Sequence, residues 1–116
     1  IRFPEWVRKH ALAGAKLIFV VAEWPEARVD HWVTLLKARA IENQLFIIAV
    51  NRVGKDPNNI FGGFSMVINP WGDTIAIGST TESILYADLN IQEVDQVRTR
   101  ISVFEDRRED LYNRKK

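Results

Sequence analysis

The sequence predicts an α/β protein built from layers of helix and sheet. Two segments with helically spaced apolar residues each precede a short, continuous apolar run. The second half is richer in turns and carries the pattern of a hairpin. Consecutive strands joined through a helix are expected to be parallel. At 116 residues the chain fits one domain with a limited core.

The first half is predicted to begin with a helix and a strand. Residues 4–13 start with Pro4, which suits the first position of a helix, and their helical spacing continues until Gly14 ends it. A strand is expected over residues 16–21, because the residues after Lys16 are apolar without alternation, which is typical of a strand buried on both faces. The sequence therefore places this strand inside the protein.

A second helix and a second strand follow in the same order. The helix is expected over residues 30–44, because Asp30 is a good N-cap and the apolar positions after it follow a period of about 3.6 residues. The strand is expected over residues 45–50, again as a continuous apolar run. The order helix, strand, helix, strand is the α/β pattern.

The second half is predicted to contain short strands separated by turns. Residues 52–63 are rich in Gly and Asn and predict a long loop, and Pro-Trp-Gly-Asp between two apolar segments predicts a hairpin turn. A short helix is expected before an irregular, charged C-terminal segment. The predicted elements are strands at 64–69, 74–77 and 83–89 and a helix at 91–98.

Composition excludes several classes of protein. The chain is 47% hydrophobic and 27% charged, which is ordinary for a soluble globular protein, and its net charge is +1. That balance argues against nucleic-acid or membrane partners, and the longest apolar run, residues 17–22, is too short to span a bilayer. The basic residues 114–116 are expected to be a solvated end. The absence of Cys excludes disulfides and thiolate metal sites in this chain and is compatible with a cytoplasmic location.

Five segments in a fixed order resemble one enzyme family. They are Arg-Phe-Pro-Glu at 2–5, His-Trp and the helix after it at 31–44, Asn-Arg-Val-Gly at 51–54, Gly-Phe-Ser to Pro-Trp-Gly at 63–72, and Val-Phe, Arg-Arg and Leu-Tyr within 103–112. Together they resemble the nitrilase superfamily, the carbon–nitrogen hydrolases, and within it the ω-amidase-like bacterial members. The resemblance covers nearly the whole chain, whereas any one segment alone would be a weak signal.

The resemblance implies a fold and an activity. The family fold is an αββα four-layer sandwich, and residues 1–116 would form half of it as the C-terminal part of a single hydrolase domain. Family members hydrolyse amides or nitriles through a Cys thioester, using a Glu-Lys-Cys triad. The likeness to the ω-amidase-like members implies a small amide that is hydrolysed to acid and ammonia. The family's Cys-Tyr-Asp sequence would stand directly before Ile1. The resemblance therefore implies that the triad lies upstream, that this chain holds no catalytic residue, metal or cofactor, and that alone it is inactive.

Three residues after the first predicted strand are the main candidates for a substrate pocket. Pockets of α/β folds lie beyond the carboxyl ends of the strands. The resemblance implies that Ala22, Glu23 and Trp24 line the site for a small-molecule amide. The alternative for Trp24 is local packing beside Pro25.

His31, Asn51 and Arg2 are further candidates, each with two interpretations. His31 could face the pocket, but a lone His in the first turn of a helix is more often structural, and the two His residues lack metal-ligand spacing. Asn51 could form hydrogen bonds near the pocket or cap the following turn, and the turn is preferred. Arg2 could support the nucleophile elbow through ion pairs or form an ordinary ion pair where the helix begins.

Arg39 and Glu42 lie three residues apart and could pair on one helix face. The resemblance implies that this helix contributes to a homodimer interface, so both residues are interface candidates. Phe64 departs from the family, since many relatives have His there, and any supporting role of that His is lost or replaced.

Two other functions are compatible with the sequence. The protein could keep this fold as a non-catalytic interaction module, which a missing upstream Cys, Glu or Lys would favour. An unrelated α/β enzyme could instead use His31 together with Glu23 or Asp30.

Overall fold

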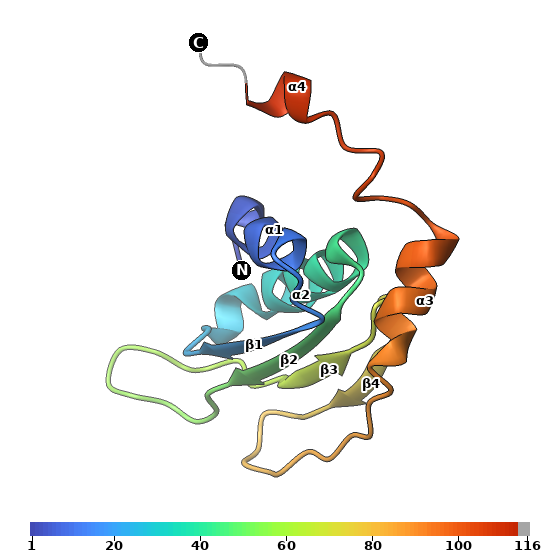
Figure 1. Ribbon diagram of the computed structural model, residues 1–116. Helices are drawn as coiled ribbons and strands as arrows, with labels where there is room; N and C mark the ends of the chain where they lie inside the picture. Colours follow the sequence, from blue (N-terminus) through green and yellow to red (C-terminus); the bar gives the residue numbers. More distant parts are fainter. Residues whose placement is uncertain (114–116) are drawn as a thin grey trace.

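The structure, a computed structural model, describes residues 1–113. Within them a mixed sheet of four strands has the order β1-β2-β3-β4, and helices α1 and α2 cover one of its faces (Figure 1). The predicted α/β class is confirmed. In chain order the elements are α1 (Pro4–Leu12), β1 (Leu17–Ala22), the 3-10 turn η1 (Glu26–Arg28), α2 (Val29–Asn43), β2 (Phe46–Asn51), β3 (Met66–Ile68), β4 (Thr74–Ile77), α3 (Gln92–Arg100) and α4 (Glu109–Tyr112).

Strand pairing follows from the connections. β1 and β2 are parallel, as the helix between them predicts, and Ala22 pairs with Asn51 at their last positions. β2, β3 and β4 are antiparallel, and β3 and β4 form the predicted hairpin. Asn69 shapes its turn, because its side-chain oxygen accepts hydrogen bonds from the backbone N–H groups of Trp71 and Asp73 at 3.0 and 2.9 Å.

The hydrophobic core lies between α2 and the sheet. Trp32, Leu36 and Ala40 are spaced by four along α2, are fully buried, and share one core with Ile47 and Ala49 of β2. The helical period of 3.6 and the strand period of 2 thus bring two apolar surfaces together. Burial of each large side chain contributes about 1.5–3 kcal/mol.

The second helix begins one residue earlier than the sequence predicts, and Asp30 is not its N-cap. α2 follows directly after η1, so Arg28 stands at the cap position and Asp30 already lies in the first turn. An acid in the first turn still interacts favourably with the positive end of the helix dipole. At the other end, Gln44 terminates the helix in the left-handed conformation with φ of 49°.

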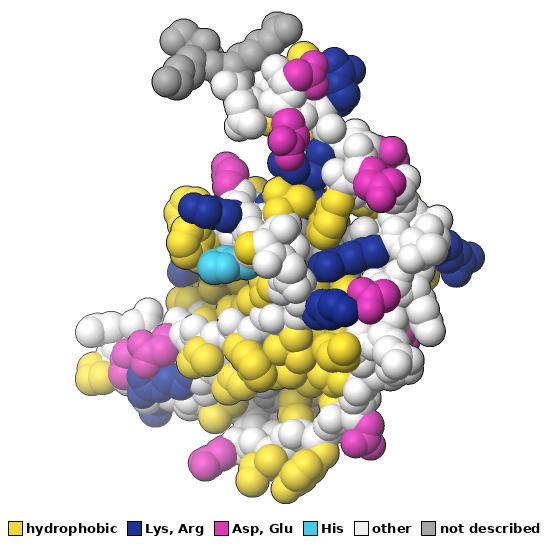
Figure 2. Space-filling view, viewed as in Figure 1, with side chains coloured by type: hydrophobic (Ala, Val, Ile, Leu, Met, Phe, Trp, Pro, Cys, Tyr) yellow, Lys and Arg dark blue, Asp and Glu magenta, His cyan; other side chains and the backbone are white. Residues whose placement is uncertain are grey.

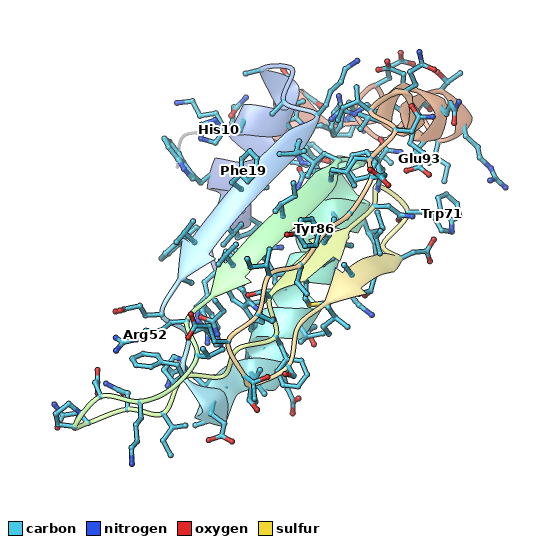
Figure 3. All side chains as sticks on the ribbon, turned by 90° about the horizontal axis from the view of Figure 1, so that it is seen from below. His10, Phe19, Arg52, Trp71, Tyr86 and Glu93 are labelled. Atoms are coloured by element: carbon cyan, nitrogen blue, oxygen red, sulfur yellow. The ribbon has the colours of Figure 1, made fainter. Side chains whose placement is uncertain are left out.

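The expectation that β1 is buried on both faces is wrong. Phe19 and Val21 are 71% and 84% exposed, and Val50, which pairs with Val21, is 52% exposed. Figure 3 views this face, with Phe19 in front of the sheet. The helices α1 and α2 lie on the opposite face, and no second sheet among residues 1–113 covers this one. Hydrophobic side chains accordingly reach the surface from the helices down to the lower edge of the molecule (Figure 2).

Residues 83–89 are not a strand, and the strand expected at 64–69 is shorter. The alternation that predicted a strand is still present, since Ile84 and Tyr86 are 77% and 85% exposed while Leu85 between them is partly buried. The segment crosses the face seen in Figure 3 and encloses a hollow of about 270 Å³ against β2 and β3. No described strand lies beside it with which it forms a ladder.

The C-terminal segment leaves the sheet at the β4 side and ends in α4, which stands clear of the sheet (Figure 1). Arg98 of α3 joins this segment to the body by donating hydrogen bonds to the carbonyls of Ala15 and Asn43 at 3.0 and 3.2 Å. Burial lowers the pKa of the Arg98 guanidinium. No helix of residues 1–113 is both long and apolar enough to cross a membrane. Residues 114–116, expected to be a solvated end, lie outside the described part.

Candidate functional site

The candidate site lies at the carboxyl ends of β1 and β2. These parallel strands end side by side, with the partly buried Ala22 opposite Asn51. The chain continues from β1 through Trp24 into η1, and from β2 into the loop of residues 52–63. Several of the predicted pocket residues therefore share one end of the sheet, as the α/β pattern requires.

Arg2 lies against Trp24 and His31. Its guanidinium carbon is 4.9 Å from the centre of the Trp24 ring, and its Nη2 is 3.2 Å from Nδ1 of His31. Arg can only donate, so Nδ1 of His31 is the acceptor of this hydrogen bond. The structure records no ion pair between Arg2 and an Asp or Glu of residues 1–113. An aromatic face and an imidazole therefore hold this exposed guanidinium, rather than the carboxylates that the sequence suggested.

Two tryptophans connect this cluster to the core. The Trp24 ring lies 5.7 Å from the ring of Trp32 at an angle of 43°, and its Nε1 donates a hydrogen bond to the carbonyl of Arg28 at 2.6 Å. Trp32 is fully buried, and its Nε1 donates to the carbonyl of Phe64 at 2.8 Å. Both indole N–H groups are therefore satisfied, which fixes the rings. Trp24 thus combines the predicted local packing with a position beside Arg2.

Asn51 does not cap the turn that follows it, which was the preferred interpretation of the sequence. Its side chain instead bonds to the backbone of Trp24 and of Gly63. Its backbone N–H donates to Oγ of Ser65 at 2.9 Å. Asn51 is 4% exposed, so it joins three segments from inside the protein.

Glu23 has no recorded hydrogen bond or ion pair with Arg2, Trp24 or His31. Its carboxylate forms an ion pair of 2.9 Å with Arg52, and both side chains are well exposed. The Arg52 guanidinium also lies 4.3 Å from the centre of the Phe61 ring, at the end of the sheet that carries the long loop (Figure 3). Glu23 therefore belongs to the loop of residues 52–63 and not to the group around Arg2.

The structure provides no acid–base pair for the unrelated-enzyme hypothesis. His31 is exposed, and no hydrogen bond to Glu23 or Asp30 is recorded for it. Within residues 1–113, no group of three or more His, Asp or Glu side chains could hold a metal ion. The groups that the structure does bring together here are a cation, the Arg2 guanidinium, and an aromatic face, the Trp24 ring.

Arg39 forms the predicted pair with Glu42 and also a bond that the sequence did not predict. Its Nη1 is 2.7 Å from Oε1 of Glu42, and its Nε donates to the carbonyl of Ile1 at 2.9 Å. Arg39 is only 6% exposed, whereas the side chain of Glu42 is 37% exposed. The buried guanidinium thus ties Ile1, the neighbour of Arg2, to α2.

Sequence reasoning missed the roles of Gly63 and Phe64. Both have positive φ, 63° and 52°. A Cβ on Gly63 would lie 2.5 Å from the carbonyl oxygen of Ser79, so only Gly fits there. Phe64 is a bulky residue in the left-handed region, which costs on the order of 1–3 kcal/mol. The Gly-Gly pair at 62–63 was the available signal for the turn, whereas nothing in the sequence indicates the conformation of Phe64.

Residues 1–99 match the carbon-nitrogen hydrolase family, and the chain belongs to this family. The resemblance found in the sequence is thereby confirmed. The chain is 53% identical to 2-oxoglutaramate amidase of Bacillus subtilis, over 97% of this chain and 43% of that protein. It is 39% identical to omega-amidase YafV of Escherichia coli K12, over 91% of this chain and 41% of that protein. The chain thus spans less than half the length of these relatives.

Solved structures agree with this assignment. The NitFhit protein of Caenorhabditis elegans superposes with a TM-score of 0.89 at 38% identity, over 96% of this chain and 27% of that one. A carbon-nitrogen hydrolase of Helicobacter pylori G27 gives a TM-score of 0.87 at 32% identity, over 96% of this chain and 44% of that one. The predicted nitrilase-type fold is therefore confirmed.

Proposed function

We propose that residues 1–116 form the C-terminal part of a single carbon–nitrogen hydrolase domain with ω-amidase-like activity. The substrate is a small amide that also carries a carboxylate, and the products are the acid and ammonia. The observation that carries the proposal is the cluster of Arg2 and Trp24 at the ends of two parallel strands. The identity of 53% to a protein named 2-oxoglutaramate amidase supports the substrate class.

In this proposal the chain supplies a pocket wall and not the nucleophile. The Glu-Lys-Cys triad lies upstream of Ile1, where the Cys thiolate attacks the amide carbonyl, ammonia leaves with a proton from Glu, and water hydrolyses the thioester to the acid. Arg2 is suited to the substrate carboxylate, because a guanidinium donates two parallel hydrogen bonds to such a group. Trp24 offers a flat apolar face beside it.

The exposed face of the sheet supports a second layer. Phe19, Val21 and Val50 are each more than half exposed, and an apolar face of this kind marks an interaction surface. We assign the face to the second sheet of an αββα sandwich, supplied by the upstream part of the same domain.

The helical face supports a homodimer in the same proposal. Trp6 of α1 is 61% exposed and Ile41 of α2 is 53% exposed. Of the two predicted interface residues, Glu42 reaches the surface, whereas Arg39 is used inside the protomer. A cytoplasmic location, with which the absence of Cys in residues 1–116 is compatible, completes the proposal.

The test is ammonia release from 2-oxoglutaramate by the natural protein that contains this chain, with the 116-residue chain alone beside it. We expect the natural protein to release ammonia and to lose the activity when the Cys expected three residues before Ile1 is replaced by Ala. We expect the chain alone to be inactive. Thiol-independent release by the chain alone would contradict the proposal, and a natural protein without that Cys would favour the non-catalytic interaction module.

A further inference from the structure

The side-chain amide of Asn51 is fully occupied by backbone groups of two other segments. Its Oδ1 accepts a hydrogen bond from the N–H of Trp24 at 2.6 Å. Its Nδ2 donates to the carbonyls of Trp24 and Gly63 at 3.1 and 2.9 Å. The residue is 4% exposed. An amide with one acceptor bond and two donor bonds to backbone has little capacity left for a ligand, so Asn51 is not a substrate contact.

The Asn51 side-chain amide continues the hydrogen bonding beyond the last residue pair of β1 and β2. Regular pairing of β1 with β2 ends at Ala22 and Asn51, two residues before Trp24. The Asn51 side chain then pairs with both the N–H and the carbonyl of Trp24, as the peptide group of a neighbouring strand would. The N–H of Gly62 also donates to the Trp24 carbonyl at 2.8 Å. The backbone of Trp24 is therefore fixed from two sides.

Fixing this backbone fixes the pocket wall. The Trp24 ring lies 4.9 Å from the Arg2 guanidinium, and its indole N–H is bonded to the Arg28 carbonyl. A shift of the Trp24 backbone moves the ring and the cation that rests on it. We propose that Asn51 is a positioning residue of the amide-binding site, which places Trp24, and through it Arg2, without touching the substrate. This inference rests on the proposed function.

Asn51→Asp tests the hydrogen bonds of the side-chain amide while nearly keeping the shape of the side chain. Asn51→Asp keeps the acceptor for the Trp24 N–H but replaces the two donors by a carboxylate oxygen that faces the carbonyls of Trp24 and Gly63. Ser65→Ala is the matched control. It removes a hydrogen bond to the backbone of the same residue, and Ser65 has no recorded bond to Trp24 or Gly63.

The experiment measures kcat and KM for 2-oxoglutaramate with the natural full-length protein. We expect Asn51→Asp to raise KM at least about tenfold, equivalent to about 1.4 kcal/mol, with kcat changed less than about threefold. Ser65→Ala should leave KM unchanged. In a Trp24→Ala background, Asn51→Asp should raise KM less than about twofold further, because the residue acts through Trp24. An unchanged KM in Asn51→Asp, or fully additive effects in the double variant, would overturn the inference.

A spectroscopic readout keeps this inference separate from the proposed function. In protein carrying ¹⁵N-labelled tryptophan, Asn51→Asp should shift the indole N–H signal of Trp24 and leave that of Trp71 in place. If the natural protein hydrolyses no amide but the signal shifts, the proposed function fails, whereas the placement of Trp24 by Asn51 is supported. If the signal does not shift, the positioning role fails. Should Asn51→Asp not fold, Asn51→Ser, which retains one donor and one acceptor, is measured in the same way with the same expected directions.

Discussion

Replacement of Trp32 by Phe tests whether a single indole N–H holds the strained segment beside the site. Trp32 is fully buried in α2, and its Nε1 donates to the carbonyl of Phe64 at 2.8 Å. Phe64 has φ of 52°, so its conformation depends on its surroundings. Trp32→Phe keeps an aromatic ring but removes the donor and leaves a small cavity.

The expected loss of stability follows from the missing hydrogen bond and from the cavity. A carbonyl left without its partner costs about 1–3 kcal/mol. Contraction of a fully buried ring adds about 1 kcal/mol for the cavity. We therefore expect Trp32→Phe to lower the free energy of unfolding by about 2–4 kcal/mol.

The assay is urea denaturation of the natural protein, with Trp71→Phe as the matched control. Trp71 lies in the hairpin turn, is 49% exposed, and its ring rests against the Arg100 guanidinium at 5.1 Å, a contact that Phe retains. The control should change the free energy of unfolding by less than about 0.5 kcal/mol. Equal effects of the two substitutions would refute the reasoning, because the chemical change is the same and the two sites differ in the buried hydrogen bond and in the burial of the ring.

Two further predictions concern the loops around the site. Gly63→Ala should lower the free energy of unfolding by about 1–3 kcal/mol, since its Cβ would lie 2.5 Å from a backbone carbonyl oxygen at φ of 63°. Gly14→Ala, at φ of 104° but with open space around the Cβ, should lower it less. An equal loss of stability in the two variants would contradict the steric argument. The backbone N–H of Asn58 is the largest cause that holds the pKa of Asp56 below its ordinary value. The ionised Asp56 carboxylate therefore stabilises its loop at pH values above its ordinary pKa of about 4. This contribution is lost as the pH falls through the lower pKa that Asp56 has in the folded protein. The amide NMR signal of Asn58 should follow the titration of Asp56 in the natural sequence and should show no such transition in Asp56→Asn. A titration midpoint at or above the ordinary pKa of Asp would contradict the lowered pKa.

Local patterns in the sequence predicted most of the fold. The helical spacing before each apolar run predicted α1 and α2, and the helix between β1 and β2 predicted their parallel pairing. The turn at Pro70 predicted the hairpin, and the spacing of three residues predicted the pair of Arg39 and Glu42. Each of these features depends on residues close in sequence, which is why they could be predicted.

Features that depend on distant segments could not be predicted. The apolar run around Phe19 indicates burial but not which element would cover it, and residues 1–113 supply helices to one face only. Residues 83–89 alternate like a strand but lack a described neighbour with which to pair. The short turn η1, and not Asp30, sets the start of α2. Asn51 bonds to Trp24 across 27 positions, a contact that no local pattern indicates.

The most direct test of the central claim compares two amides in the natural protein and in its Arg2→Gln variant. One amide is 2-oxoglutaramate, and the other is butyramide, which has no carboxylate. The account predicts that the natural protein has the higher kcat/KM for 2-oxoglutaramate and that Arg2→Gln reduces this preference at least about tenfold, through the loss of a charge-assisted carboxylate contact. Butyramide has no carboxylate for Arg2 to bind, so activity toward butyramide should change far less. Arg2 is held at the site by Trp24 and His31. An unchanged preference in Arg2→Gln would contradict the claim that this chain forms the carboxylate-binding wall of an amidase.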